Sequence, residues 1–467
     1  MGSTFHGIIA FALMAALLVI GSLLRSRLQW LRTAMVPGSI VAGLIGFAGL
    51  SLGTIPGYGP KDFTSLAFPF FTLSFMSLCL TGSPKRQNDG QRSGITMGGL
   101  WLTLIWTASL GVQAVIGYGL MAGYDALSGQ HLSPLLGAIA THGFTQGPGQ
   151  ALTYGNIWEQ DYGITHAAQV GVIFASLGFL AAFLVGVPVA RYCLKKGLNT
   201  NRNSTLDADF VAGFHPPANQ PSAGRQVSHS GTVDSFAWHI GLLGIAYVIT
   251  YLWLSAMQPL VAGNRVLSVF FSYNLFFAHG LTVCVLMRLA IDRLGWSHRV
   301  DDDTLKRITS GSIDFMVVAT LMSIQVAVLS ALLVPILLVA VAITLVTLCG
   351  ALAIGRMSGR LGPERALTAF GCCCGSTGTG LLLLRMLDND FTTPVPKELA
   401  FFNIAIIVVN IPTLFFFAPI APALGAWTYI AIFGGYALLA LACIPLLRRW
   451  QQRTDATRSI AQEPSLP

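Results

Sequence analysis

The stretch LLGAIATHGFTQGPGQAL, residues 135–152, is apolar at both ends and interrupted in its middle. Three glycines, a proline, a histidine and two glutamines stand at residues 141–150, where a membrane helix would place its apolar centre. Non-helical backbone at membrane depth leaves amide and carbonyl groups without partners, so it is tolerated only where it is buried in protein or lines a cavity. The stretch therefore predicts a broken, functional segment inside the membrane instead of an ordinary spanning helix.

The rest of the chain is typical of a polytopic membrane protein. Of its 467 residues, 54% are hydrophobic and 10% are charged, against roughly 25% charged residues in soluble domains. Runs of about 20 apolar residues are long enough to cross a bilayer as helices. The predicted fold class is all-α, with eleven spanning helices at residues 7–24, 36–53, 66–82, 98–121, 167–190, 236–257, 266–287, 308–329, 331–354, 399–423 and 426–447. The first run is followed by arginines and is expected to stay as a helix, not to be removed as a signal peptide.

Two stretches, residues 132–154 and 366–387, are predicted to be re-entrant hairpins, because glycines and polar residues break each apolar run. Residues 195–235 are rich in Asn, Ser, Pro and Gly, which predicts a flexible cytoplasmic linker. The predicted domains are a first transmembrane repeat at 1–194, this linker, a second repeat at 236–424, and an extra helix with a cytoplasmic tail at 425–467.

The basic residues predict the orientation of the chain. With both hairpins re-entrant, 24 of the 27 basic residues fall on one side, Arg385 ends the second hairpin, and only Lys61 and Arg265 lie opposite. Lysine and arginine stay in cytoplasmic loops. The N-terminus is therefore predicted to lie outside and the C-terminus in the cytoplasm, and the net charge of +8 reflects orientation, not nucleic-acid binding.

The two halves of the chain match at a constant offset of 231 positions. TQGPGQAL at 145–152 falls on STGTGLLL at 376–383, and Pro188 falls on Pro419. With five crossings in each half, the second copy enters from the opposite side. This pattern is typical of an inverted-topology repeat, in which two broken segments form the substrate site between them.

The broken segments have the chemistry of an ion and anion site. Glycine allows sharp turns and close approach of a ligand, and a helix that restarts after a break presents free N–H groups to a carboxylate. Opposing carbonyl ends suit Na⁺. The alternative interpretation is that both stretches are glycine-rich packing helices. The predicted side-chain donors at the two tips are Thr145, Gln146, Ser376, Thr377 and Thr379, and the glycines that let backbone approach the ligand are Gly147, Gly149, Gly378 and Gly380.

The sequence resembles the bacterial sodium/glutamate symporter family. The resemblance is carried by VPGSIVAGLIG at 36–46, by the stretch 135–152, by ASLGFLAAFLVGVPVARY at 175–192 and by ALTAFGCCCGSTGTG at 366–380, and it covers most of residues 4–423. It implies two inverted five-helix repeats, a homodimer in the bacterial inner membrane, and Na⁺-coupled uptake of glutamate or a related carboxylate, with Na⁺ as the coupling ion and no other cofactor. The family's tips map to residues 142–150 and 371–380, so His142 joins the candidate substrate-binding residues, and Thr141, directly before the first tip, is a further candidate. Family members usually have a GGHGT-like first tip, whereas this chain has HGFTQGPG.

Other polar residues have two interpretations each. Arg385 is either a clamp for a substrate carboxylate or an interfacial residue near Asp388. Asp314, an acid inside a predicted span, is a sodium candidate or a solvated residue near the inner surface. Asn410 is a second sodium candidate, or an amide that links helices.

A membrane-embedded enzyme acting on a lipid-linked substrate is the alternative function. Its support is VDDDT at 300–304, an acidic cluster that could hold Mg²⁺. No second carboxylate cluster or nucleophile–base pair accompanies it, and the cluster is also explained as a solvated loop. A passive channel would need polar rings on several helices, which the sequence lacks. The chain is therefore predicted to be a transporter and not an enzyme.

Overall fold

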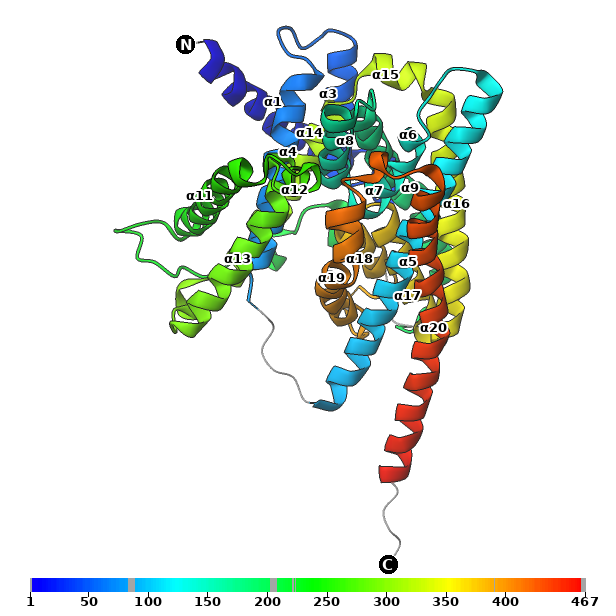
Figure 1. Ribbon diagram of the computed structural model, residues 1–467. Helices are drawn as coiled ribbons and strands as arrows, with labels where there is room; N and C mark the ends of the chain where they lie inside the picture. Colours follow the sequence, from blue (N-terminus) through cyan, green and yellow to red (C-terminus); the bar gives the residue numbers. More distant parts are fainter. Residues whose placement is uncertain are drawn as a thin grey trace, which may run out of the picture. The chain divides into compact units, whose positions relative to one another are not determined.

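The computed structural model describes residues 2–82, 89–201, 208–220, 222, 224–389 and 391–462 (Figure 1). These residues form helices joined by loops, and no strand occurs among them. The chain divides into two compact units. Unit 1 comprises Met1–Lys85, Pro148–Ser176 and Asp207–Leu333, and unit 2 comprises Arg86–Gly147, Leu177–Leu206 and Val334–Pro467.

Unit 1 is built on α4 (Pro60–Leu80) and α14 (Asp302–Met322), which pack along each other. The helix α3 (Gly38–Ser51) approaches α14 closely, because a Cβ at Gly43 or Gly46 would lie 2.6 Å from the side chain of Leu321 or Met322. The other elements of unit 1 are α1 (Gly2–Arg27), α2 (Gln29–Ala34), α8 (Pro148–Tyr162), α10 (Ala208–Ala212), α11 (Ser235–Val261), α12 (Arg265–Phe270), α13 (Phe276–Arg293), α15 (Val326–Ala331) and the short 3-10 turns η1 (Pro217–Asn219), η2 (Tyr273–Leu275) and η3 (Ser297–Arg299).

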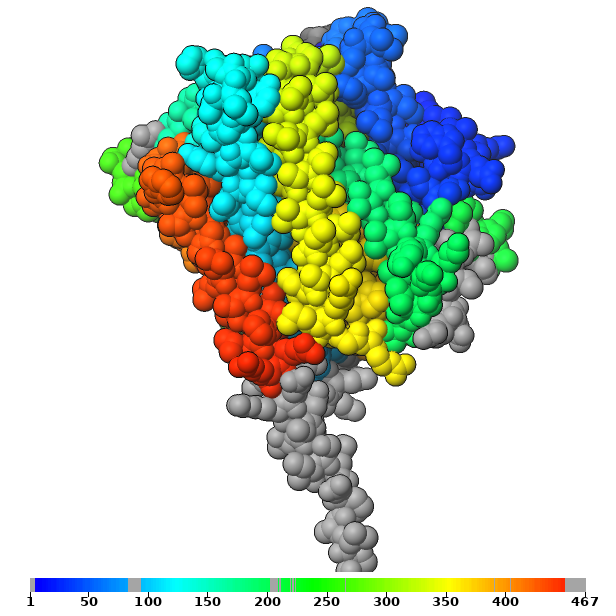
Figure 2. Space-filling model, turned by 90° about the vertical axis from the view of Figure 1, so that its right-hand side faces the viewer, coloured from blue at the N-terminus to red at the C-terminus, as the bar shows by residue number. Residues whose placement is uncertain are grey.

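Unit 2 is built on α5 (Asp89–Ser128), which packs against both α19 (Val395–Ile411) and α20 (Ala426–Gln462). Figure 2 shows α16 (Leu333–Gly355, yellow) along the surface beside α5 (cyan). Apolar side chains of α16, among them Leu338, Val341 and Leu345, are exposed. The other elements are α6 (Leu135–Ala138), α7 (Ala140–Gln146), α17 (Gly362–Cys374), α18 (Thr377–Leu387), and the short helical turns η4 (Arg356–Leu361), η5 (Pro412–Phe417) and η6 (Ala421–Ala423). The helix α9 (Ala167–Lys195) begins in unit 1 and continues in unit 2.

Nine helical stretches within the described residues are long and apolar enough to cross a membrane, and each overlaps one of the eleven predicted spans. Together they make this a multi-pass membrane protein. The predicted spans 36–53 and 308–329 are not among the nine. The first is the 14-residue α3, whose rise of about 21 Å is short of the roughly 30 Å hydrocarbon layer. The second corresponds to α14, which begins among charged residues and ends at Met322.

Both predicted helix breaks are present. The first helical segment ends at Gln146, Gly147 adopts a φ of +84°, and α8 restarts at Pro148. In the second, α17 ends at Cys374 and α18 begins at Thr377. The two arms α17 and α18 lie side by side, since a Cβ at Gly371 would lie 2.7 Å from Cα of Gly380. Whether these arms form hairpins that leave the membrane on the side they entered stays a prediction.

The described beginning of the 195–235 segment is held against unit 2. Asn199 Nδ2 donates to the carbonyl oxygen of Leu387 at 3.2 Å, and Asn201 Nδ2 donates to Asp388 at 3.0 Å. Thr200 donates its hydroxyl to the carbonyl oxygen of Arg360 at 2.6 Å, and its amide donates to Glu364. Asn199 to Asn201 therefore connect the start of α17 with the end of α18.

Candidate functional site

The break after α7 meets the break between α17 and α18 inside unit 2. A Cβ at Gly147 would lie 3.3 Å from the carbonyl oxygen of Gly375. The positive φ of Gly147 lies in a region that L-residues with a side chain rarely adopt. Two segments 228 positions apart in the sequence therefore bring their irregular backbone together, as the sequence predicts for the two tips.

A glycine of α9 lets this helix approach both breaks. A Cβ at Gly178 would lie 2.4 Å from the carbonyl oxygen of Cys374 and 3.4 Å from Cα of Phe144. Any larger residue at this position would push one of the two segments away. Gly178 lies in the ASLGFLAAF stretch that carries part of the family resemblance, although the sequence alone gives it no role at the tips.

The start of α18 presents donors at the second break. Ser376 has extended backbone and caps the helix, with its Oγ accepting from the amide of Thr379 at 3.3 Å. The amide of Gly380 donates to the carbonyl oxygen of Ser376. The amides of Thr377 and Gly378, the first two of the helix, have no acceptor within the helix. With the helix dipole they favour an anion at this end.

The first tip is anchored to α5. The indole Nε1 of Trp106 donates to the carbonyl oxygen of Thr145 at 3.1 Å, and the hydroxyl of Thr141 donates to the carbonyl oxygen of Leu110 at 2.7 Å. Thr145 donates its own hydroxyl to the carbonyl oxygen of Thr141 at 2.6 Å. The two threonine hydroxyls, predicted to bind substrate, thus have acceptors within the protein.

Gln113 of α5 connects three elements near the second break. Its Nε2 lies 3.0 Å from Ser109 Oγ, from Thr347 Oγ1 of α16 and from the carbonyl oxygen of Cys373. Sequence reasoning missed Gln113 and Trp106. Gln113 is the one amide side chain in the apolar run 98–121, and this signal is equally typical of a helix contact.

Two amide groups near the breaks have a buried polar atom without a hydrogen-bond partner among the described residues. They are Nε2 of Gln146, a donor, and Oε1 of Gln113, an acceptor. The other amide atom of Gln146, Oε1, lies 3.3 Å from Nδ1 of His142, which is itself buried. An unpaired buried donor next to Gly147 is suited to a ligand carboxylate, since burial of an unpaired polar group costs free energy.

The remaining predicted tip residues differ in how much space surrounds them. Gly378 is exposed, and a Cβ there would touch only Ser376 Oγ at 3.4 Å. Gly380 is closely packed, with a Cβ 2.4 Å from Cys372 Sγ. Gly149 belongs to unit 1, where a Cβ would overlap the ring of Phe71. Of these glycines, only Gly378 leaves room for a ligand beside it.

The hydroxyl of Thr377 is also engaged. It donates to Oδ1 of Asn403 on α19 at 2.7 Å. This contact ties the second break to α19. Thr379 Oγ1 lies 3.3 Å from Ser376 Oγ, so the hydroxyls of the second tip support its cap.

Arg385 does not lie at the tip. It follows Ser376 by nine residues, which is about 13 Å along a helix, and its guanidinium lies 6.0 Å from the ring centroid of Phe391. Its position near the C-terminal end of α18 agrees better with the interfacial interpretation than with the carboxylate clamp.

The two sodium candidates lie in different units. Asp314 of α14 belongs to unit 1 and is hydrogen-bonded to Ser39 of α3. Asn410 belongs to unit 2, at the end of α19, and donates from Nδ2 to Thr107 Oγ1 of α5 at 2.9 Å. Asn410 is fully buried.

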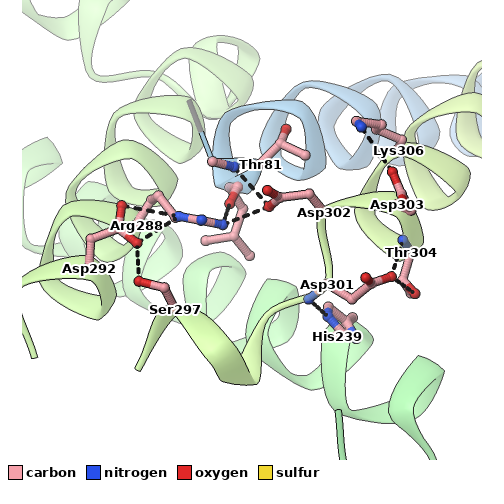
Figure 3. A network of polar contacts seen from close by, with 12 residues as sticks. Thr81, His239, Arg288, Asp292, Ser297, Asp301, Asp302, Asp303, Thr304 and Lys306 are labelled. Carbon is pink, nitrogen blue, oxygen red and sulfur yellow. Dashed lines mark hydrogen bonds and ion pairs between the residues drawn. The ribbon is translucent and has the colours of Figure 1, made fainter. Parts of the chain in front are cut away.

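The acidic segment 300–304, on which the enzyme alternative rests, is occupied by structural contacts (Figure 3). Asp302 accepts from Arg288 Nη1 at 2.8 Å, and Asp303 pairs with Lys306 at 2.9 Å. Within the described part of the chain, no group of three or more His, Cys, Asp or Glu residues is placed to hold a metal ion.

Asp301 caps α14. Its Oδ2 accepts from the amide and the hydroxyl of Thr304, each at 2.8 Å, and its own amide donates to Nε2 of His239. Burial raises the pKa of Asp301, but the bonds from Thr304 and from the backbone of Arg225 outweigh it, so the pKa lies below its usual value. The carboxylate is thus held charged by its contacts at the helix cap.

Comparison with known proteins identifies the family. The family model described as sodium/glutamate symporter matches residues 4–383. The chain is 25% identical over 391 residues to proteins named sodium/glutamate symporter from Escherichia coli (strain K12) and from Shigella flexneri, covering 82% of this chain and 88% of each relative. A protein of the same name from Haemophilus influenzae is 21% identical over 243 residues, which is 51% of this chain and 56% of that protein. The chain therefore belongs to the sodium/glutamate symporter family, a family of sodium-coupled transporters and not of enzymes.

Proposed function

We propose that this chain takes up a small organic anion, such as glutamate or a related carboxylate, together with Na⁺, and binds it where the two helix breaks meet. The observation that carries the proposal is the approach of Gly147 to Gly375 within unit 2. Beside it lie the first two amides of α18, which have no acceptor within that helix, and the buried Nε2 of Gln146, which has no hydrogen-bond partner among the described residues. These groups donate hydrogen bonds, as an anionic substrate requires.

The substrate carboxylate accepts from the amides of Thr377 and Gly378 and from Gln146 Nε2. The helix dipole of α18 adds a partial positive charge at the same place. Gln113 Oε1, buried and without a hydrogen-bond partner among the described residues, is available as an acceptor for an ammonium group of the substrate. A donor set for a carboxylate with an acceptor for an ammonium group favours an amino acid over a simple carboxylate.

Transport follows an alternating-access cycle around two opposed re-entrant hairpins, 132–154 from the outer side and 366–387 from the cytoplasmic side. The chain acts as a homodimer in the bacterial inner membrane, with its N-terminus outside and its C-terminus in the cytoplasm. The segregation of basic residues supports this orientation.

Uptake into proteoliposomes tests the function. An imposed Na⁺ gradient is expected to drive accumulation of glutamate or another amino dicarboxylate, and simple dicarboxylates and neutral amino acids are the comparison substrates. Accumulation driven by a pH gradient and not by Na⁺ would contradict the coupling. Equal uptake of a dicarboxylate that lacks an ammonium group would contradict the role of Gln113.

A further inference from the structure

Two oxygen atoms at the junction of α19 and η5 are buried without a partner. Asn410 lies in the last turn of α19, one residue before the helix ends at Ile411, and Thr413 lies in η5. Both residues are 0% exposed, and neither Oδ1 of Asn410 nor Oγ1 of Thr413 has a hydrogen-bond partner among the described residues. Buried polar atoms are nearly always paired, so two unpaired oxygens three positions apart point to a ligand.

The orientation of the Asn410 amide is determined by its neighbours. Nδ2 lies 3.0 Å from the carbonyl oxygen of Ile406 and 2.9 Å from Thr107 Oγ1. A backbone carbonyl can only accept, so the nitrogen must face it. Exchanging the two amide atoms would place two oxygens against each other. The unpaired atom of Asn410 is therefore the acceptor.

The backbone at this place is also unusual. The amide of Ala418 donates to the carbonyl oxygen of Thr413 at 2.8 Å, which is the i to i+5 pattern of a π-helix. Such turns are rare, and they are frequently found at functional sites. At the offset of 231 positions, Asn410 and Thr413 fall on Phe179 and Ala182 of α9, so the matching place in the other half has no side-chain oxygen. The two oxygens are thus not a general requirement for packing such a helix.

The available atoms select the class of ligand. Asn410 Oδ1 and Thr413 Oγ1 offer lone pairs, and the hydroxyl oxygen of Thr107 has a second lone pair beside the one that receives Asn410 Nδ2. The set is neutral and consists of oxygen atoms. An anion would need donors, and divalent cations prefer carboxylates. The set suits a monovalent cation with a preference for oxygen ligands.

We propose that Asn410 Oδ1, Thr413 Oγ1 and Thr107 Oγ1 supply ligands to the coupling Na⁺ ion, between α5 and the junction of α19 with η5. The proposal rests on the proposed function, because it assigns a place to the ion that drives uptake. It adds Thr413 and Thr107, which the sequence alone does not single out. It also connects the ion site with α19, the helix whose Asn403 accepts from Thr377 at the second break.

The first test measures how the protein responds to Na⁺ without substrate. Purified wild-type protein in detergent is heated at increasing NaCl, with choline chloride keeping the ionic strength constant. Na⁺ is expected to raise the midpoint of unfolding of the wild type and of Thr413→Ser, which keeps the hydroxyl. Thr413→Val and Asn410→Leu are expected to lose most of that rise. The matched control is Thr344→Val, because Thr344 is a buried threonine of unit 2 whose hydroxyl donates to the carbonyl oxygen of Ala340.

The second test measures uptake as a function of Na⁺ in proteoliposomes. Thr413→Val is expected to raise the half-saturating Na⁺ concentration at least tenfold, and Thr413→Ser and Thr344→Val to leave it within twofold. Wild-type Na⁺ dependence in both Thr413→Val and Asn410→Leu would overturn the site while the proposed function stands, and a water molecule would then be the partner of the two oxygens. Wild-type protein without any Na⁺-driven uptake would instead overturn the proposed function.

Discussion

Gly378 and Gly380 lie two positions apart in α18, yet a side chain would affect them differently. A Cβ at Gly378 meets only Ser376 Oγ at 3.4 Å, whereas one at Gly380 would lie 2.4 Å from Cys372 Sγ. Gly378→Val is therefore expected to fold at normal membrane levels and, by filling the space beside the free amides, to lower uptake at least tenfold. Gly380→Val is expected to lower the amount of folded protein. Normal uptake kinetics in Gly378→Val would mean that the substrate does not approach α18 there.

Gln146 allows binding and stability to be separated. Gln146→Leu removes a buried donor that has no partner among the described residues, together with the 3.3 Å contact between Gln146 Oε1 and His142 Nδ1, so the gain and the loss offset each other and the free energy of unfolding should change little. The substrate would lose one hydrogen bond to a charged group, typically worth about 1.5–3 kcal/mol, so KM should rise roughly ten- to hundredfold. Uptake kinetics and thermal unfolding of the same preparation provide both values. A fall in stability with KM unchanged would place Gln146 in a packing role with His142.

The sequence predicted the tip residues but not the groups that hold them. Glycines and a proline in an apolar run indicate a break wherever they occur, which is why Gly147 and the Gly375–Ser376 break were identifiable. Trp106 and Gln113 sit in an ordinary helix, and their role depends on which distant carbonyl oxygens they reach. Such contacts depend on packing between elements, which no local pattern contains.

At the level of elements, the start of α14 shows why a charge pattern is ambiguous. The sequence predicts a span from residue 308, because the acidic residues before it are typical of a loop. The helix begins at Asp302, six residues earlier, because Asp301 accepts from Thr304 and caps it. The acidic residues that support an enzyme as the alternative function are therefore explained by a helix start.

The contacts of Asn199 to Asn201 predict that this short segment holds the N-terminal end of α17 and the C-terminal end of α18 together. Thr200→Val removes the hydroxyl bond to Arg360, and Asn201→Ala removes the bond to Asp388. Each lost bond is expected to lower the free energy of unfolding by about 1 kcal/mol. Hydrogen exchange should become faster at residues 360–364 and 387–388. Gln220→Ala, an exposed position of the same segment, is the control. Unchanged hydrogen exchange in a variant that combines Thr200→Val with Asn201→Ala would show that α17 and α18 are held together by their own packing.

At the scale of the whole molecule, the path of the chain across the membrane remains a prediction from charge. The nine membrane-long stretches agree with the predicted spans in position, but length and composition do not say which side each loop faces. The inverted repeat depends on that assignment. The offset of 231 positions brings the two tips into register, and only opposite orientation of the two copies would let them approach the midplane from opposite faces.

Labelling with an impermeant thiol reagent tests this topology directly. Single cysteines at Gln130 and Gln160 flank the first broken segment, and those at Arg360 and Lys397 flank the second; all four positions are exposed. In a background with the exposed Cys349 replaced by serine, the first two are expected to react in intact cells. The other two should react only in inverted membrane vesicles. If Gln130 and Gln160 label from opposite faces, the first segment crosses the membrane and the basic residues after it change sides. If all four label from one face, the two copies share one orientation, and the two helix breaks cannot reach the midplane from opposite sides.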